Sequence, residues 1–218
     1  MGQTVTGRGR RRQAETGTET AGNSFAPAGR AWHHGRVLNG LLTGYQAAGE
    51  AEAADVERMR RLAEAAADPW SRSQLPLHFT ASALVVHPPT RRVLLRWHIK
   101  HDGWLQVGGH GDPGETDPLQ IALREAREET GLTDLVPWPD ATLRHAAVCY
   151  VRPSGGDPEH EHGDLRFFLA TGHPDAIAPE NAQSPLRWLA VDEARALVGE
   201  NNLSETLDRA EALFEAHP

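Results

Sequence analysis

A glycine-rich loop that leads into a charged helix constrains this chain more than any other stretch. The segment from Gly108 to Leu132 reads GGHGDPGETDPLQIALREAREETGL. Asp117 and Pro118 predict the start of the helix, because an aspartate caps free amide groups and proline is well tolerated at the first helical position. Gly131 predicts its end, since glycine readily adopts the left-handed conformation that closes a helix. We therefore expect a helix between these residues, entered from a glycine loop.

Three glutamates gather on one face of this helix. At 100° per residue, Glu125, Glu128 and Glu129 fall within an arc of about 100°. A different face is apolar and carries Leu119, Leu123, Ala126 and Thr130. Carboxylates at this spacing repel one another by a few tenths of a kcal/mol per pair, and oxygen ligands without His or Cys suit Mg²⁺ or Mn²⁺. A solvated acidic face is the alternative, but the adjacent glycines, which let backbone approach a ligand closely, favour a metal site.

Composition narrows the class of protein. A chain of 218 residues with 39% hydrophobic content is expected to form one main domain. The net charge is −8, and residues 1–36 hold six Arg and two Glu, which leaves 16 basic and 28 acidic residues in the remainder. An acidic body argues against a nucleic-acid partner. Residues 1–30 are poor in apolar side chains, so we expect them to be a disordered tail.

The expected location of the protein in the cell rests on features that are missing from the sequence. Cys149 is the only cysteine, and between Val148 and Tyr150 it is expected to be a small buried hydrophobe. No apolar run approaches the roughly 18 residues of a membrane span, and the N-terminus has no secretory h-region. We therefore expect a cytoplasmic protein with no membrane partner.

The hydrophobic pattern changes along the chain. Apolar residues between positions 37 and 67 recur at helical spacing and predict two short helices. Asp68-Pro69 is expected to end the second helix. Short β-branched or aromatic runs then predict strands at 79–87, 92–97, 104–107, 144–151, 165–170 and 186–189. Closing helices are expected at 191–198, capped by Asp192, and at 203–216. A mixed sheet between helices follows, an α/β or α+β sandwich.

The segment described first resembles the Nudix box. The box has a glycine, five residues, a glutamate, a spacer, and then Arg-Glu, two residues, Glu-Glu, one residue and Gly with an aliphatic residue. The matching positions are Gly109, Glu115, Arg124, Glu125, Glu128, Glu129, Gly131 and Leu132. The spacer from Thr116 to Leu123 has eight residues where the family has seven, which leaves the metal-binding half intact and makes the role of Glu115 less certain.

The resemblance implies a fold and a division of the chain. It implies a Nudix-type α/β/α sandwich with a mixed β-sheet at residues 77–216, with the box at 109–132. A short helical N-terminal segment at residues 31–76 precedes this domain. The sequence leaves open whether that segment is a lid, a homodimer surface or simple packing.

The resemblance also implies a mechanism. By similarity, Glu125, Glu128 and Glu129 hold Mg²⁺ or Mn²⁺, the carbonyl of Gly108 adds a ligand, and Arg124 orients Glu125 through an ion pair. The metal lowers the pKa of a bound water that attacks phosphorus. Glu125 is the leading candidate for the base.

Residues near the box are candidates for substrate binding or for completing the metal site. His110 lies inside the loop, and Trp97 and Trp104 could either stack a nucleobase or belong to the core. The stretch from Glu159 to Asp164 (EHEHGD) looks like a metal site, although two histidines in a polar loop are often only solvated. Within it, Glu161 and Asp164 could supply the acidic residue that this family often takes from beyond the box.

Together these features predict a hydrolase that cleaves a diphosphate linkage in a nucleoside diphosphate derivative. One alternative is a Nudix-fold ligand sensor or regulator without turnover. Another is an enzyme like the isopentenyl diphosphate isomerases, which need a catalytic cysteine that Cys149 does not clearly supply. The sequence does not identify the substrate.

Overall fold

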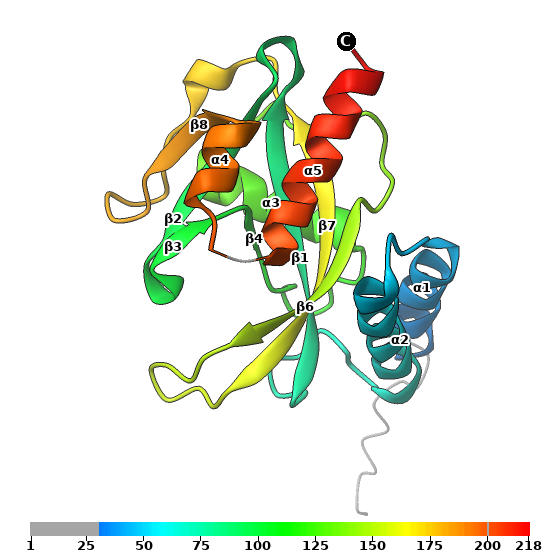
Figure 1. The fold of residues 1–218 in the computed structure, drawn as a ribbon. Coiled ribbons are helices and arrows are strands. Elements are labelled where there is room, and N and C mark those ends of the chain that lie inside the picture. Colours follow the sequence, from blue (N-terminus) through cyan, green and yellow to red (C-terminus); the bar gives the residue numbers. More distant parts are fainter. Residues whose placement is uncertain (1–30, 200) are drawn as a thin grey trace, which may run out of the picture.

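A mixed sheet of eight strands forms the centre of the protein in this computed structural model, which describes residues 31–199 and 201–218 (Figure 1). The strands are β1 (Leu77–His87), β2 (Arg92–His98), β3 (Gly103–Leu105), β4 (Val107–Gly109), β5 (Val136–Pro137), β6 (His145–Val151), β7 (His160–Ala170) and β8 (Leu186–Ala190). The helices are α1 (Ala31–Gly44), α2 (Glu50–Ala65), α3 (Pro118–Thr130), α4 (Val191–Leu197) and α5 (Asn201–Ala216). The main strand order is β3-β2-β1-β7-β5, with β4 on β1, β6 on β7 and β8 on β2.

The central strand β1 has apolar side chains on both faces, and each face packs against different helices. It runs parallel to β7 from Leu77 opposite Glu161 to Val86 opposite Ala170. Its odd-numbered residues from Phe79 to Val85 join one core cluster with α2 and α3. Leu84 and Val86 join a second cluster with α4 and α5. The two clusters on either side of the sheet confirm the predicted α/β/α sandwich.

Helix α3 forms where the sequence predicts it. Asp117 Oδ1 accepts hydrogen bonds from the backbone amides of Leu119 (3.0 Å) and Gln120 (3.3 Å), and Pro118 takes the first helical position. Gly131 closes the helix in the left-handed conformation, with φ of 70°. These local contacts fix the rotation of the helix and therefore the direction in which its glutamates project.

The N-terminal helical segment is part of the core. Leu38, Leu42, Val56 and Met59 are buried in the same cluster as β1 and α3. The buried carboxylate of Glu52, on α2, accepts a hydrogen bond from Arg209 of α5 at 2.7 Å. Its other partners include the hydroxyl of Tyr45. This segment therefore packs onto the domain, which is one of the three roles that the sequence leaves open.

The structure departs from the predicted elements in several places. The strand expected at 104–107 is two short strands that break at Gln106, and β5 is not predicted. β7 begins at His160, five residues early, because its first residues pair with β6 (His160 to Arg166) and with β1 (from Glu161). Asp192 is not the cap of α4: it lies in the first turn, where it pairs with Arg195, and Glu193 accepts from the amide of Ala190 instead.

Two further sequence-based expectations concern the N-terminal tail and membrane spans. The predicted disordered tail at residues 1–30 lies outside the described residues. Among the described helices, none has the length and apolar character needed to cross a membrane.

Candidate active site

A cavity of about 1070 Å³ is lined by residues from both the loop and the helix of the box. Gly108, Gly109 and His110 contribute from β4 and the residue after it, and Glu125 contributes from α3. The opposite parts of the wall come from β2, β3 and the ends of β1, β6 and β7. Cationic side chains among the lining residues are Arg72, Arg96, Lys100 and Arg152. The lining also holds the carboxylates of Asp102, Glu125 and Asp157, so it carries both signs of charge. Its cationic side chains can attract an anionic ligand.

Glu125 is held at the cavity wall by its neighbour in sequence. Arg124 Nη1 donates to Glu125 Oε1 at 2.9 Å, which is the ion pair that the resemblance to the Nudix box implies. Only 16% of the Glu125 side chain is exposed. Burial raises the pKa of Glu125 above its ordinary value, and the hydrogen bond from Arg124 opposes that rise.

Arg124 fixes the loop as well as the helix. Its guanidinium donates to Glu115 at 2.8 to 3.2 Å and to the carbonyl oxygen of His110 at 2.9 Å. These hydrogen bonds lower the pKa of Glu115. The extra spacer residue therefore does not separate Glu115 from the site, because the loop brings its carboxylate back to Arg124.

Glu129 is the most enclosed of the three helix carboxylates, with 13% of its side chain exposed. It accepts a hydrogen bond from the amide of Gly108 at 3.0 Å and pairs with Arg96 Nη1 at 3.0 Å. Arg96 also binds Glu180 at 2.9 Å. Burial raises the pKa of Glu129 to about 7, although Arg96 and the Gly108 amide act in the opposite direction.

Glu128 differs from the other two carboxylates because it is open to solvent. Its side chain is 57% exposed, and Oε2 accepts from Arg124 Nη1 at 3.1 Å. The three glutamates therefore present one open and two enclosed carboxylates.

Two glycines of β4 allow the strand to lie close to its neighbours. A Cβ atom on Gly109 would lie 2.8 Å from the Glu125 carboxyl carbon, closer than non-bonded atoms can approach. A Cβ on Gly108 would lie 2.5 Å from Ser82 Cα on β1, and its φ of 148° also disfavours other residues. The two glycines therefore allow β4 to lie between β1 and the carboxylate face of α3.

One family model matches the box and the sheet around it. Residues 76–210, well over half of the chain, match the family model described as NUDIX domain. The chain belongs to the Nudix family. The search of curated proteins found no match.

Two solved structures show the degree of similarity to this chain. The crystal structure of a C. elegans Ap4A hydrolase binary complex is 19% identical, with a TM-score of 0.51 over 63% of this chain and 97% of that one. The E. coli dihydroneopterin triphosphate pyrophosphohydrolase is 21% identical, with a TM-score of 0.47 over 62% of this chain and 93% of that one. Because the identity is below 25%, the similarity to the Ap4A hydrolase supports only the fold of this chain.

Glu161 and Asp164, the two candidates for an acidic residue from beyond the Nudix box, do not line the cavity. Asp164 is 4% exposed, and its carboxylate accepts four hydrogen bonds. The donors are Thr80 (2.9 Å), Ser82 (2.7 Å), Gln106 (3.1 Å) and Arg166 (2.8 Å). Glu161 forms an ion pair with Arg58 of α2. Both carboxylates already have protein partners that bind strands or helices together.

Two sequence-based interpretations are corrected. His160 and His162 belong to strand β7, not to a polar loop, and both line the Nudix cavity. Cys149 is half-buried, not a buried hydrophobe: its sulfur accepts hydrogen bonds from Arg166 and Asn202, at 3.2 and 3.5 Å.

His78 and Arg96 are among the cavity residues that sequence reasoning missed. His78 precedes Thr80 and Ser82 at alternate positions of β1, and this polar alternation was the available signal. Arg96 is a lone charge within the apolar run of β2, and its partner Glu129 is 33 positions further along the chain. Such long-range pairing carries no local pattern.

Trp104 and His110, the predicted substrate contacts, both line the cavity. The guanidinium carbon of Arg187 lies 5.4 Å from the Trp104 ring centre, and Trp97 contacts that ring edge-on at 5.6 Å. Burial lowers the pKa of His110 to about 3. His110 therefore presents a neutral ring to the cavity at neutral pH.

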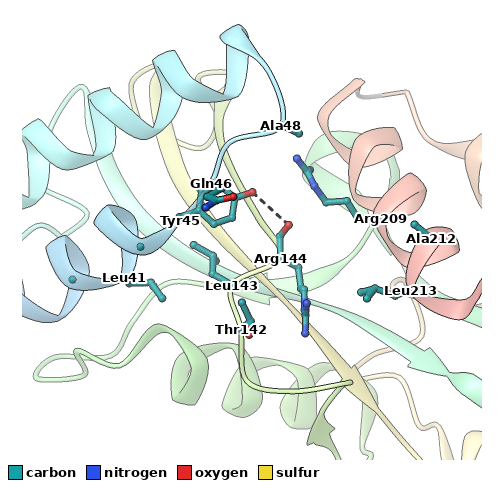
Figure 2. Close-up of a pocket in the computed structure, with 12 residues that line it drawn as sticks. Leu41, Tyr45, Gln46, Ala48, Thr142, Leu143, Arg144, Arg209, Ala212 and Leu213 are labelled. Carbon is teal, nitrogen blue, oxygen red and sulfur yellow. Dashed lines mark hydrogen bonds between the residues drawn. The ribbon is translucent and has the colours of Figure 1, made fainter. Parts of the chain in front are cut away.

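A second cavity, of about 650 Å³, lies between α1, α5 and the residues before β6 (Figure 2). Leu41, Leu143 and Leu213 give it an apolar lining, and the Tyr45 hydroxyl reaches the Arg144 carbonyl there at 3.4 Å. Its described lining has no Asp, Glu or His. It therefore lacks the ligands and bases that the Nudix cavity offers.

Proposed function

We propose that this Nudix protein is a divalent-metal-dependent hydrolase that cleaves the diphosphate linkage of a nucleoside diphosphate derivative. The observation that carries the proposal is the placement of Glu125 and Glu129 beside the Gly108-Gly109 strand, where Glu125 and both glycines meet a cavity lined by cationic side chains. The energetic cost of burying two neighbouring carboxylates suits a site that binds a cation.

The residues of the site fit Mg²⁺ or Mn²⁺. Glu125, Glu128 and Glu129, with the carbonyl of Gly108, would supply only oxygen ligands, which these hard cations prefer. Gly109 leaves space at the Glu125 carboxylate that any side chain would fill. When bound, such a cation neutralises charge on the diphosphate and lowers the pKa of a water molecule.

Glu125 is the proposed general base. Its raised pKa makes it a better proton acceptor than an exposed glutamate. Arg124 holds Oε1 at 2.9 Å, and Arg124 is itself held by Glu115 and by the His110 carbonyl. The proposed role of Arg124 is therefore to fix the carboxylate so that it takes a proton from water as that water attacks phosphorus.

The cavity wall suits the two parts of such a substrate. Arg72, Lys100 and Arg152 are available to attract phosphate groups. Trp104 is the proposed contact for a nucleobase, although Arg187 and Trp97 already contact its ring. A neutral His110 can exchange hydrogen bonds with a polar group of the ligand.

The sensor and the isomerase are the alternatives. A sensor needs the same cavity but no base, so it would bind nucleotide without turnover. An isomerase like the isopentenyl diphosphate isomerases needs a cysteine at the substrate. Cys149 is not among the residues lining the cavity, and its sulfur accepts from Arg166, which favours the hydrolase. The cytoplasmic location stays a prediction.

A substrate panel tests the proposal. Nucleotide sugars, dinucleoside polyphosphates, ADP-ribose and oxidised nucleotides are incubated with the purified chain in Mg²⁺, in Mn²⁺ and in excess chelator. We expect phosphate-bearing products from at least one class, lost in chelator and restored by metal. Binding of a panel member with no product would support the sensor, and undiminished hydrolysis in chelator would refute the metal dependence.

A matched pair of variants links the activity to the helix. Glu125→Gln and Glu129→Gln keep side-chain size and remove one anionic oxygen, so turnover should fall by orders of magnitude. Glu50→Gln, on the exposed first turn of α2, is the control and should retain normal turnover. Near-normal turnover in both helix variants would overturn the proposed role of α3.

A further inference from the structure

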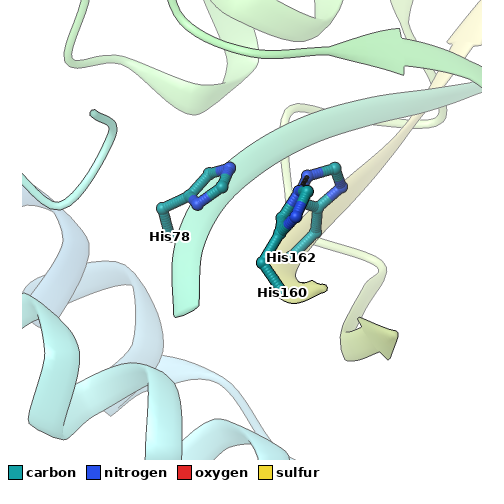
Figure 3. A group of neighbouring side chains, drawn as sticks. All are labelled: His78, His160 and His162. Atoms are coloured by element: carbon teal, nitrogen blue, oxygen red, sulfur yellow. Dashed lines mark hydrogen bonds between the residues drawn. The ribbon is translucent and has the colours of Figure 1, made fainter. Parts of the chain in front are cut away.

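Four histidines converge at one end of the cavity, from three separate parts of the chain. His160 and His162 are two apart on β7 and therefore point to the same side of the strand. His78 lies on β1 directly opposite His162 in the parallel register. Figure 3 shows the ring of His78 facing those of His160 and His162, and these three rings lie 4.9 to 5.1 Å apart. His110 joins them from the residue after β4, with its ring 4.8 Å from that of His162.

Ligand nitrogens of three of these histidines are close enough to one another to share one ion, and His110 adds a nitrogen beside that of His78. One ligand nitrogen each from His78, His160 and His162 lies within 4.8 Å of the others. Nε2 of His78 is 3.0 Å from Nε2 of His110, and Nε2 of His160 is 3.1 Å from Nε2 of His162. Two imidazoles on tetrahedral zinc, with Zn–N of about 2.0 to 2.1 Å, place their nitrogens roughly 3.3 Å apart. The two pairs therefore already lie near the spacing that a shared ion needs.

Backbone carbonyls hold two of the rings in the orientation of a metal ligand. Nδ1 of His78 lies 3.2 Å from the carbonyl oxygen of Gln74, and Nδ1 of His160 lies 2.9 Å from that of Pro158. With Nδ1 as the donor, Nε2 carries the lone pair and faces the cluster. Histidines that bind metals commonly donate their other ring nitrogen to a carbonyl in this way.

A metal ion binds the lone pair of a neutral imidazole, whereas an anion is attracted by a protonated imidazole. Burial lowers the pKa of His78 and lowers that of His162 to about 3. A cationic cluster that binds phosphate would need protonated imidazoles, so burial disfavours that use. Neutral nitrogen ligands suit Zn²⁺ and its neighbours in the transition series, whereas Mg²⁺ prefers oxygen.

We propose that His78, His110, His160 and His162 form a zinc-type transition-metal site that is separate from the glutamate site of α3. Such an ion ties the loop that carries His110, one residue after Gly109, to strands β1 and β7. It would thereby fix the glycine loop against the sheet while leaving the carboxylates to the other metal. The proposal does not depend on the hydrolase activity.

Metal binding by the untagged full chain tests the site. The chain is stripped with chelator, dialysed, and titrated with Zn²⁺ by calorimetry and with Co²⁺ by visible absorption. We expect one tight equivalent of Zn²⁺ and the absorption of tetrahedral Co²⁺ with nitrogen ligands. His162→Ala and His160→Gln should each weaken Zn²⁺ binding by more than about 100-fold, beyond the 10- to 100-fold cost of losing only a carbonyl partner of a ligand.

Three controls separate the outcomes. His217→Ala, at the exposed C-terminus, should bind Zn²⁺ like the wild type. Glu129→Gln should also retain the tight Zn²⁺ equivalent, whether or not the protein proves to be a hydrolase. Circular dichroism in chelator shows that each variant is folded, and the conservative His160→Gln serves if His162→Ala is not. The proposal is overturned if the wild type binds no tight Zn²⁺, if Glu129→Gln abolishes the binding, or if folded His160→Gln and His162→Ala retain it.

Discussion

Replacing Glu129 with glutamine should make the metal-free protein more stable at neutral pH while removing its activity. Burial raises the pKa of this carboxyl from 4.5 to about 7. The folded protein therefore binds more protons than the unfolded chain between these pH values, and the free energy of unfolding falls as the pH rises. At 1.36 kcal/mol per pKa unit, the ionised carboxylate costs up to about 3 kcal/mol above pH 7. That is a large part of the 5 to 15 kcal/mol that typically holds a domain folded.

The Glu129→Gln variant would avoid this cost and keep the local contacts. The new amide oxygen can still accept from the Gly108 amide, and Arg96 retains Glu180 as a partner. The gain in stability should be present at pH 8 and absent near pH 4.5, where the folded protein carries a protonated Glu129. The control Glu50→Gln should change stability by less than about 1 kcal/mol throughout, the usual limit for an exposed charge at a helix start.

Urea unfolding in chelator at pH 5 to 8 measures the effect. Adding Mg²⁺ should then stabilise the wild type, because a ligand that binds only the folded state raises its stability, and should stabilise the variant less. If Glu129→Gln is less stable than the wild type at pH 8 in chelator, this carboxylate is structural and the reasoning is wrong.

Three further predictions follow from individual contacts. Arg96→Met removes the cation beside Glu129, so the pKa of that carboxyl should rise further and the acidic limb of the pH–rate profile should move to higher pH; an unmoved limb would contradict this. Glu52→Gln leaves an arginine of α5 without its buried partner, and urea unfolding should show a loss of about 3 to 5 kcal/mol; an unchanged midpoint would show that the N-terminal segment adds little. Gly109→Ala should weaken Mg²⁺ binding, measured by calorimetry, with a near-native circular dichroism spectrum, because its Cβ would press on the Glu125 carboxylate; normal affinity would show that the strand can move.

The sequence predicts those parts of the fold that depend on neighbours along the chain. Helix α3 begins and ends where Asp117 and Gly131 indicate, because a cap acts within one turn. The ion pair between Arg124 and Glu125, which the resemblance to the Nudix box implies, also joins neighbours along the chain. Most strands are predicted to within a few residues, because their apolar runs reflect burial in the sheet.

Long-range pairing sets the features that the sequence does not reveal. The early start of β7 comes from its register with β1, which also brings His78 beside His162, 84 positions away. The contact between Arg96 and Glu129 joins side chains of β2 and α3, which are 33 positions apart in the sequence. Glu115 reaches Arg124 through the path of a loop whose length alone left its role uncertain. The partner in each of these contacts cannot be identified from the sequence pattern, although the polar alternation of β1 marks His78 itself.

Hydrolysis in ¹⁸O-labelled water tests the central claim most directly. The chain would be given Mg²⁺ and a diphosphate substrate from the panel, and the phosphate-bearing products would be analysed by mass spectrometry. Attack of water on phosphorus predicts one ¹⁸O atom in one of the two products at each turnover, and almost no labelled product from Glu129→Gln. Products without ¹⁸O in a phosphate group, or equal labelling by the wild type and the variant, would contradict the account.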